Sequence, residues 1–167
     1  KDISKELKKF LKSKFKKIET VHGSRDYYHI QENGISFEIV PVLDIKRDDQ
    51  AQNIMDFSPL HVKFVKRKTN KKLQKEIKLL KVFLRANGIY GAESYIRGFS
   101  GYVSELLIIY YTSLEKLVKS VREWGNGEII HFGRNKEKAL SNLSKSKKVS
   151  PLVVIDPVQK DRNASAA

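Results

Sequence analysis

Cysteine is absent from this chain of 167 residues, and long apolar runs are absent as well. The first absence excludes disulfides and thiolate metal sites. The longest apolar run, Leu106–Tyr111, is much shorter than the roughly 20 residues that a helix needs to cross a bilayer. Residues 1–17 are lysine-rich and amphipathic, without the apolar central region of a secretory signal. We therefore expect a cytoplasmic protein.

Acidic residues are scarce beside basic ones, 19 against 33, so the net charge is +14. This charge exceeds what solubility requires and favours a polyanionic partner, with nucleic acid first. The alternative is that the lysines simply cover solvated helix faces. A hydrophobic content of 40% in 167 residues is enough for one sizeable core or two small ones.

The first third of the chain predicts a helix, a hairpin and a second helix start. Apolar residues recur at helical spacing over residues 3–16. Strand-like runs at about Tyr27–Ile30 and Ile35–Leu43 are joined through Asn33-Gly34, a strong hairpin signal. Ser58-Pro59 predicts a helix entry, with Ser58 as the N-cap and Pro59 as the first helical position.

The rest of the chain is mainly helical in pattern. The expected elements are helices over residues 71–86, 101–111 and 114–124, short strands over 128–132 and 152–155, and a further helix starting at Arg162. The helix over 101–111 is apolar nearly all round, which predicts that it is buried.

The most informative stretch runs from Lys78 to Tyr111, KLLKVFLRANGIYGAESYIRGFSGYVSELLIIYY. A helix ends at Asn87-Gly88, and the loop that follows mixes Tyr90, Arg97 and several glycines. The loop then leads directly into the apolar helix. Cations, aromatics and glycines held between two buried helices are typical of a loop that grips phosphate.

This stretch resembles the central domain of the archaeal-type (class I) CCA-adding enzymes, which are tRNA nucleotidyltransferases of the polymerase-β superfamily. In that family the run NGIYGAE, followed by RGFSGY and an ELL helix, carries part of the triphosphate site. The resemblance implies an α+β fold with two parts. Residues 1–66 would be the C-terminal part of a polymerase-β-like palm, and residues 67–167 a mainly helical central domain that binds nucleotide and tRNA.

The resemblance also implies five nucleotide-binding residues. Ser58 and His61 lie in DFSPLH, which matches the family's D-x-[ST]-P-x-H segment, and Arg162 lies in DPVQKDRN, which matches D-P-x-x-x-x-R-N. Lys81 and Tyr90 match the triphosphate-binding lysine and tyrosine. The family's arginine reads the incoming base together with the tRNA backbone. Each residue also has a structural alternative: a capped helix with an exposed histidine, a solvated lysine, or a tyrosine packed in a loop.

Glu38 is the candidate catalytic and metal-binding residue. It lies in the strand pattern of Ile35–Leu43, where alternation places it opposite the apolar face, so the simplest interpretation is a solvent-facing carboxylate. The resemblance aligns it with the third metal-binding carboxylate of the palm, usually Asp in the family, and implies Mg²⁺ as the cofactor. Two-metal phosphoryl transfer uses such carboxylates to hold both ions.

The first two carboxylates of the superfamily follow a Gly-Ser…Asp-x-Asp pattern that this chain lacks, because Gly23-Ser24 is followed by Arg25-Asp26-Tyr27-Tyr28. By the resemblance, residue 1 falls just after that motif, and residue 167 falls before the family's C-terminal tail domain. We therefore expect this chain alone to be inactive. A second polypeptide could supply the first palm strands.

Three further residues are candidates for RNA binding. Tyr27 and His29 lie where the family has a His-Pro-Tyr element, from which this sequence departs. Arg97, after the glycine-rich loop, is predicted either to contact RNA phosphate or to form a buried ion pair with Glu93 or Glu105.

The resemblance thus implies part of an enzyme that adds C, C and A to the 3′ end of tRNA from CTP and ATP. Its partners would be the tRNA acceptor stem, with a homodimer or a complementing N-terminal segment also considered. Two other functions stay open: a related oligoadenylate or poly(A) polymerase, and a non-catalytic RNA-binding module. Use of CTP would separate the CCA-adding enzyme from the other polymerases.

Overall fold

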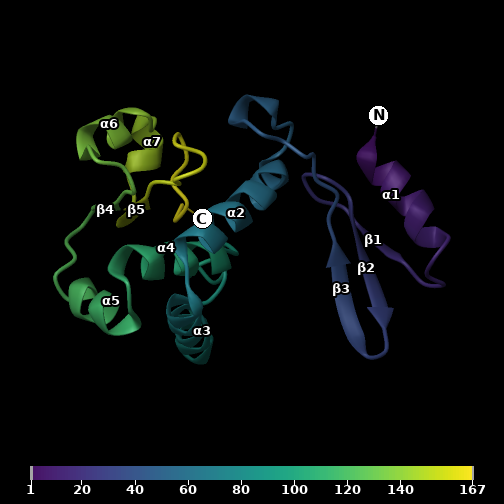
Figure 1. Cartoon of the computed structure of the whole chain (residues 1–167), viewed down its shortest axis with the longest axis horizontal. Helices are drawn as coiled ribbons and strands as arrows, with labels where there is room; N and C mark the ends of the chain where they lie inside the picture. The colour runs from purple at the N-terminus through teal and green to yellow at the C-terminus, as the bar shows by residue number, and fades with distance from the viewer. Residues whose placement is uncertain (1, 167) are drawn as a thin grey trace. The chain divides into compact units, whose positions relative to one another are not determined.

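The computed structural model describes residues 2–166. The chain forms two compact units, Lys1–Pro59 and Leu60–Ala167, and both combine helices with short strands (Figure 1). This mixture confirms the α+β class. The division lies in the first turn of α2 (Ser58–Lys68), whereas the sequence pattern puts it at residues 66/67. Within the described residues, no helix is long and apolar enough to span a membrane.

The first unit is a small antiparallel sheet with one helix against it. Its elements are α1 (Ile3–Lys12), β1 (Glu19–Val21), β2 (Tyr27–Glu32), β3 (Ile35–Ile39) and the 3₁₀ turns η1 (Asp48–Gln50) and η2 (Ile54–Phe57). The strand order is β1-β2-β3. Asn33 and Gly34 have φ values of 51° and 76°, which confirms the predicted hairpin turn.

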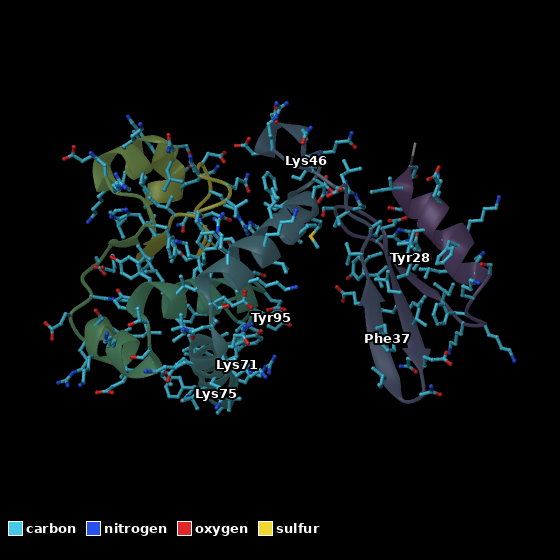
Figure 2. The ribbon with its side chains drawn as sticks, in the orientation of Figure 1. Tyr28, Phe37, Lys46, Lys71, Lys75 and Tyr95 are labelled. Carbon is cyan, nitrogen blue, oxygen red and sulfur yellow. The ribbon has the colours of Figure 1, made fainter. Side chains whose placement is uncertain are left out.

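Tyr28 anchors the core of this unit. Its ring packs with Leu11 and Ile30, and its hydroxyl donates to the carbonyl of Ser4 at 2.6 Å, which joins β2 to α1 (Figures 1 and 2). Ile30 pairs with Phe37, so both point to the same face of the sheet. Phe37 is nevertheless 46% exposed, because α1 covers β2 more fully than β3.

The second unit is built round an apolar helix. Its longer helices are α2, α3 (Lys71–Ala86), α4 (Gly101–Tyr111) and α5 (Leu114–Val121). Both α3 and α5 contact α4. Val103, Leu106 and Ile108 of α4 are almost completely buried, which confirms the prediction from its apolar sequence. The side chain of Ser100 caps α4 by accepting from the backbone N–H of Val103.

A parallel strand pair completes the second unit. β4 (Glu128–Ile130) pairs with β5 (Leu152–Val154), and the connection carries α6 (Lys136–Ser141) and α7 (Lys145–Lys148). Leu143, Val153 and Ile155 form a core between this connection and the strands. The central core, which includes Ile130 and Val154, lies on α4.

The prediction of a helix starting at Arg162 is wrong. The backbone of Asn163 forms an antiparallel bridge with Ile155, and its side-chain oxygen accepts from the backbone N–H of Val154 at 3.0 Å. Asn163 is therefore used to tie the turn to β5, and a helix starting there would lose these bonds.

The prediction that Ser58 is an N-cap is also wrong. Its backbone is helical, with φ −54° and ψ −43°, and its N–H already donates to the carbonyl of Met55 because η2 runs into α2. Asn53 provides the cap instead, through an oxygen that accepts from the N–H of Met55. The idea that a free helix N-terminus at Ser58 receives an anion consequently has no structural basis.

Candidate functional site

Lys81 and Glu105 join α3 to α4 at the edge of the second unit's core. The Nζ of Lys81 lies 2.7 Å from Oε1 of Glu105, and both side chains are about a quarter exposed. The helical register of α3 places Lys81 beside the buried Leu80 and Leu84, so its ammonium is held at the core edge. The pair is close enough to the surface for an anionic ligand to compete for the cation.

Tyr90 reaches the same place from the loop between α3 and α4. A Cβ added at Gly101 would stand 2.9 Å from the hydroxyl oxygen of Tyr90 and 3.7 Å from Nζ of Lys81. The absence of a side chain at Gly101 therefore lets the hydroxyl and the ammonium approach the start of α4. The guanidinium of Arg85 lies over the Tyr90 ring, 4.4 Å from its centroid.

Backbone hydrogen bonds join the two ends of the loop between α3 and α4, and the close approach of its ends requires glycine. Phe99 donates to the carbonyl of Ile89 at 2.9 Å, and Gly91 donates to the carbonyl of Phe99 at 3.0 Å. A Cβ at Gly98 would stand only 2.2 Å from the carbonyl oxygen of Ile89. The two hydrogen bonds are made by the residues on either side of Tyr90, so they fix its position.

Asp156, two residues after the end of β5, is the most heavily bonded carboxylate of the second unit. It is fully buried and receives the backbone N–H groups of Val158 and Gln159 at 2.8 and 3.2 Å. The hydroxyl of Tyr102 donates to it at 3.1 Å. Nε2 of His61 lies 3.0 Å from its other oxygen. A buried carboxylate with this many donors holds several elements in fixed orientation.

Burial raises the pKa of Asp156, but the hydrogen bond and charge of His61 and the two backbone donors outweigh it, so the pKa lies below its usual value. Burial, followed by the adjacent charge of Asp156, raises the pKa of Tyr102. Tyr102 is consequently a neutral hydrogen-bond donor. Its ring stacks on the His61 imidazole, with centroids 4.1 Å apart and planes 26° from parallel.

Arg162 approaches Asp156 from the turn after β5. Its Nη1 donates to Oδ2 of Asp156 at 3.2 Å, and 30% of its side chain is exposed. Among the described residues this is its one side-chain hydrogen bond. A guanidinium has five N–H donors, so a carboxylate can orient one edge of the group while another edge meets a ligand.

Four predicted nucleotide-binding residues thus gather at the N-terminal part of α4 and are called the Lys81 cluster below. Lys81 and Tyr90 meet at Gly101, and His61 and Arg162 meet through Asp156, which is bonded to the next residue of α4, Tyr102. Ser58 lies one helical turn before His61 on α2.

Glu38, Tyr27 and His29 belong to the first unit and lie on one face of its sheet. His29 Nε2 is 3.2 Å from Oε2 of Glu38, and the His29 and Tyr27 rings meet edge-on at 5.6 Å. The Glu38 side chain is 58% exposed. Throughout residues 2–166, no group of three or more His, Asp or Glu side chains is placed to hold a metal ion, so these donors alone do not form a two-metal centre.

Asp56 is the buried anchor of the first unit. It pairs with Arg25 (Nη2 to Oδ2, 3.1 Å) and accepts backbone N–H groups from Leu43, Gln52 and Asn53 at 2.8 to 3.0 Å. Burial raises its pKa, but the bond from Arg25 and the backbone donors prevail and lower the pKa to about 2. Asp56 is the first residue of the DFSPLH segment, and the motif match alone did not predict this role for it.

Arg97 lies outside the cluster around Lys81. It is exposed, has a φ of 52°, and donates from Nε to the carbonyl of Ser94. It lines a separate cavity with residues near the C-terminal end of the described chain. The alternative of a buried ion pair is wrong, because the side chain is exposed and Glu105 pairs with Lys81.

The family model described as "tRNA nucleotidyltransferase, second domain" matches residues 75–167. The match covers more than half of the chain and all residues of the Lys81 cluster except His61. The chain belongs to the tRNA nucleotidyltransferase family.

Curated members of the family extend the match into the first unit. The CCA-adding enzyme of Nanoarchaeum equitans is 40% identical over 151 residues, which are 88% of this chain and 38% of the relative. Those of Saccharolobus solfataricus and Archaeoglobus fulgidus are each 34% identical, cover 87% of this chain, and are themselves covered over 33% and 31% of their lengths. The chain therefore spans about a third of the curated nucleotidyltransferases that it matches.

The sequence patterns did not single out two residues that contact the four side chains of the Lys81 cluster. Tyr102 connects His61 to Asp156, and Glu105 orients Lys81. Their positions in the RGFSGY run and the ELL helix were the available signal. Spacing could not identify their partners, because Tyr102 is 54 residues from Asp156 and Glu105 is 24 residues from Lys81.

Proposed function

We propose that this chain is part of a CCA-adding tRNA nucleotidyltransferase, which adds C, C and A to the 3′ end of tRNA from CTP and ATP. The observation that carries the proposal is the convergence of Lys81, Tyr90 and Arg162 on the first turn of α4 and on Asp156. Family membership and the similarity to CCA-adding enzymes support the same conclusion.

In this proposal Lys81 and Tyr90 bind the triphosphate. The ammonium offsets phosphate charge and the hydroxyl donates to a phosphate oxygen. Glu105 limits the motion of Lys81 by pairing with it at 2.7 Å. The two groups are anchored on different segments, α3 and the following loop, so their fixed separation favours one triphosphate conformation.

Arg162 presents its guanidinium to the edge of the incoming base. Asp156 holds one Nη group, which restricts rotation of the planar fork. His61 and Ser58 approach the nucleotide from α2, with His61 oriented by its stack on Tyr102 and its contact with Asp156. Selectivity between C and A would then depend on a preorganised donor set as well as on the tRNA.

The reaction itself joins two substrates. The 3′-hydroxyl oxygen of the tRNA attacks the α-phosphorus, the bond to the bridging oxygen breaks, and pyrophosphate leaves. Residues 1–66 would be the latter part of the palm, with Glu38 as its third carboxylate. Two further carboxylates from another segment would be needed to hold Mg²⁺ ions, so this chain alone is expected to be inactive.

The tRNA acceptor stem would lie along basic and aromatic surfaces. Tyr27 and His29 of the sheet and the exposed Arg97 are the proposed contacts, and a net charge of +14 supports binding to the phosphate backbone. An A-form stem is recognised through its shape and backbone more than through its base sequence.

Primer extension on tRNA lacking CCA tests this function. The assay would use labelled CTP and ATP with this chain alone and with the N-terminal segment of a relative added. Incorporation of both nucleotides only after the addition is the expected result. Incorporation by this chain alone would disprove its inactivity. Use of ATP without CTP in the completed enzyme would indicate an oligoadenylate or poly(A) polymerase, and tRNA binding without any extension would indicate a non-catalytic module.

A further inference from the structure

A second cavity, of about 850 Å³, lies in the second unit beside the C-terminal end of α4. Asp156 lies both in its lining and among the bonds that hold His61 and Arg162. It is lined by the C-terminal part of α2, the end of α4, the segment after β4 and the segment after β5. Gly101 is the first residue of α4 and Tyr110 the last but one, and nine residue steps of helix separate them by about 13 Å. The cavity is therefore distinct from the place where Lys81 and Tyr90 meet.

The rim of this cavity is strongly basic. Five cationic side chains line it: Arg67, Lys68, Arg134, Lys138 and Lys160. Asp156 is the one carboxylate among the lining residues, and its oxygens are already bound by His61, Tyr102, Arg162 and two backbone N–H groups. The net field in the cavity is consequently positive, and it favours an anion such as a phosphodiester.

The wall of the cavity is aromatic. Phe132 meets Phe64 and Tyr110 edge-to-face, with centroids 5.7 and 6.0 Å apart. Arg67 lies over the ring of Phe64 at 6.0 Å. Tyr110 is 41% exposed, which is unusual for a residue of this buried helix. Aromatic faces beside cations are the combination on which unpaired bases stack while their phosphates are neutralised.

His131 adds a polar group inside the cavity. Its Nδ1 is buried and has no hydrogen-bond partner among the described residues. Buried polar atoms are normally paired, so an unpaired one in a cavity wall points to a ligand that supplies the missing bond.

We propose that this cavity binds an unpaired nucleotide of RNA, with the base against Tyr110 and Phe132 and the phosphates on the basic rim. The inference rests on the proposed function in that the ligand is RNA. It adds a second contact site, whose Tyr110 lies about 13 Å along α4 from Gly101. A single-stranded segment fits better than a duplex, because a base must leave its stack to reach an aromatic wall.

Fluorescence anisotropy with the 167-residue chain tests the site. The probes are a fluorescein-labelled oligocytidylate and a blunt RNA duplex of the same length. The double variant Arg134→Gln/Lys138→Gln should bind the single strand at least about fivefold more weakly. Its plot of log K against log salt should also be shallower by about 1.4, which is two phosphate contacts at about 0.7 each for a single strand. Lys9→Gln/Lys12→Gln on α1 removes the same charge from exposed positions and is the matched control.

Tyr110 separates stacking from charge. Tyr110→Leu should weaken binding of the single strand about fivefold or more and leave duplex binding unchanged, and Tyr110→Trp should retain the affinity. The fluorescence of Trp124, the single tryptophan of the chain, reports whether the Gln and Leu variants are folded, and far-UV circular dichroism checks Tyr110→Trp, which carries a second tryptophan. Two results would overturn the inference. One is an equal loss of single-strand affinity in Arg134→Gln/Lys138→Gln and Lys9→Gln/Lys12→Gln. The other is an equal loss of affinity for the single strand and the duplex in Tyr110→Leu. CTP binding that depends on Lys81 is measured alongside, so failure of the second site is distinguishable from failure of the proposed function.

Discussion

Nε2 of His61 lies 3.0 Å from Oδ2 of Asp156, and this contact connects α2 to the turn after β5. The two side chains are also joined through Tyr102, which stacks on the imidazole and donates to the carboxylate. His61 of the DFSPLH motif and Asp156 of the DPVQKDRN motif therefore belong to one cluster. Its stability determines whether Arg162 is held in place.

Replacing Asp156 by Asn should lower the free energy of unfolding of the second unit by about 3 kcal/mol at neutral pH, because it leaves buried donors without their charged acceptor. The folded-state pKa of Asp156 is depressed, so its contribution is present above the unfolded pKa near 4 and is lost as the pH falls through the folded value. Urea unfolding followed by Trp124 fluorescence should show a weaker acid dependence in the variant.

Asp161→Asn is the control for this variant, since Asp161 lies in the same turn and its side chain is 62% exposed. A surface carboxylate contributes little, so this substitution should change stability by less than about 1 kcal/mol. Equal effects of the two substitutions would contradict the central role assigned to Asp156.

Asp56 should confer a separate acid sensitivity on the first unit. A pKa lowered from 3.8 to about 2 corresponds to about 2 kcal/mol of stabilisation, which is complete above about pH 4 and lost between about pH 4 and 2. The protection factor for hydrogen exchange at the backbone N–H of Leu43, which donates to Asp56, should therefore fall over this range. In Asp56→Asn exchange should be fast already at neutral pH, and an unchanged rate there would argue against the anchor.

Lys81 should contribute specifically to binding the β- and γ-phosphates. Lys81→Met is expected to weaken CTP binding about tenfold or more and to change CMP binding little, because CMP lacks those groups. Lys78→Met, on the same helix at an exposed position, is the control and should bind both nucleotides normally. Isothermal titration calorimetry of each variant with each nucleotide measures these affinities. Equal losses of CTP and CMP affinity in Lys81→Met would show that Lys81 does not act on the β- and γ-phosphates.

Local signals predicted many elements of the fold. The Asn33-Gly34 turn follows from conformational preference, and the span of α3 from apolar periodicity ended by Gly88. α1 ends at Lys12, earlier than the pattern predicts, and its cap is Asp2. The end of a helix depends on tertiary contacts that periodicity does not encode.

The errors at Ser58 and Arg162 have a common physical cause. Ser58 carries a helix-start signal, and a helix was also expected from Arg162 onward. In both places a neighbouring segment already binds the groups concerned: η2 binds Ser58, and β5 binds Asn163, the residue after Arg162. Partners such as Glu105 for Lys81, or Tyr102 for Asp156, depend on how α3, α4 and the turn after β5 pack together. The motifs identified which side chains matter, and packing determined which of them touch.

Arg162 provides the sharpest test of base selection. Arg162→Lys keeps the positive charge but loses the planar set of donors, so it should preserve tRNA binding while reducing the discrimination between CTP and ATP about tenfold. The measurement is the ratio of C to A incorporation at each position, made with the N-terminal segment supplied. Arg122→Lys, an exposed conservative change after α5, is the control. The backbone N–H of Val158 donates to Asp156, so its protection from hydrogen exchange shows whether the turn is intact. Unchanged selectivity in Arg162→Lys, with this protection retained, would show that the guanidinium does not read the base.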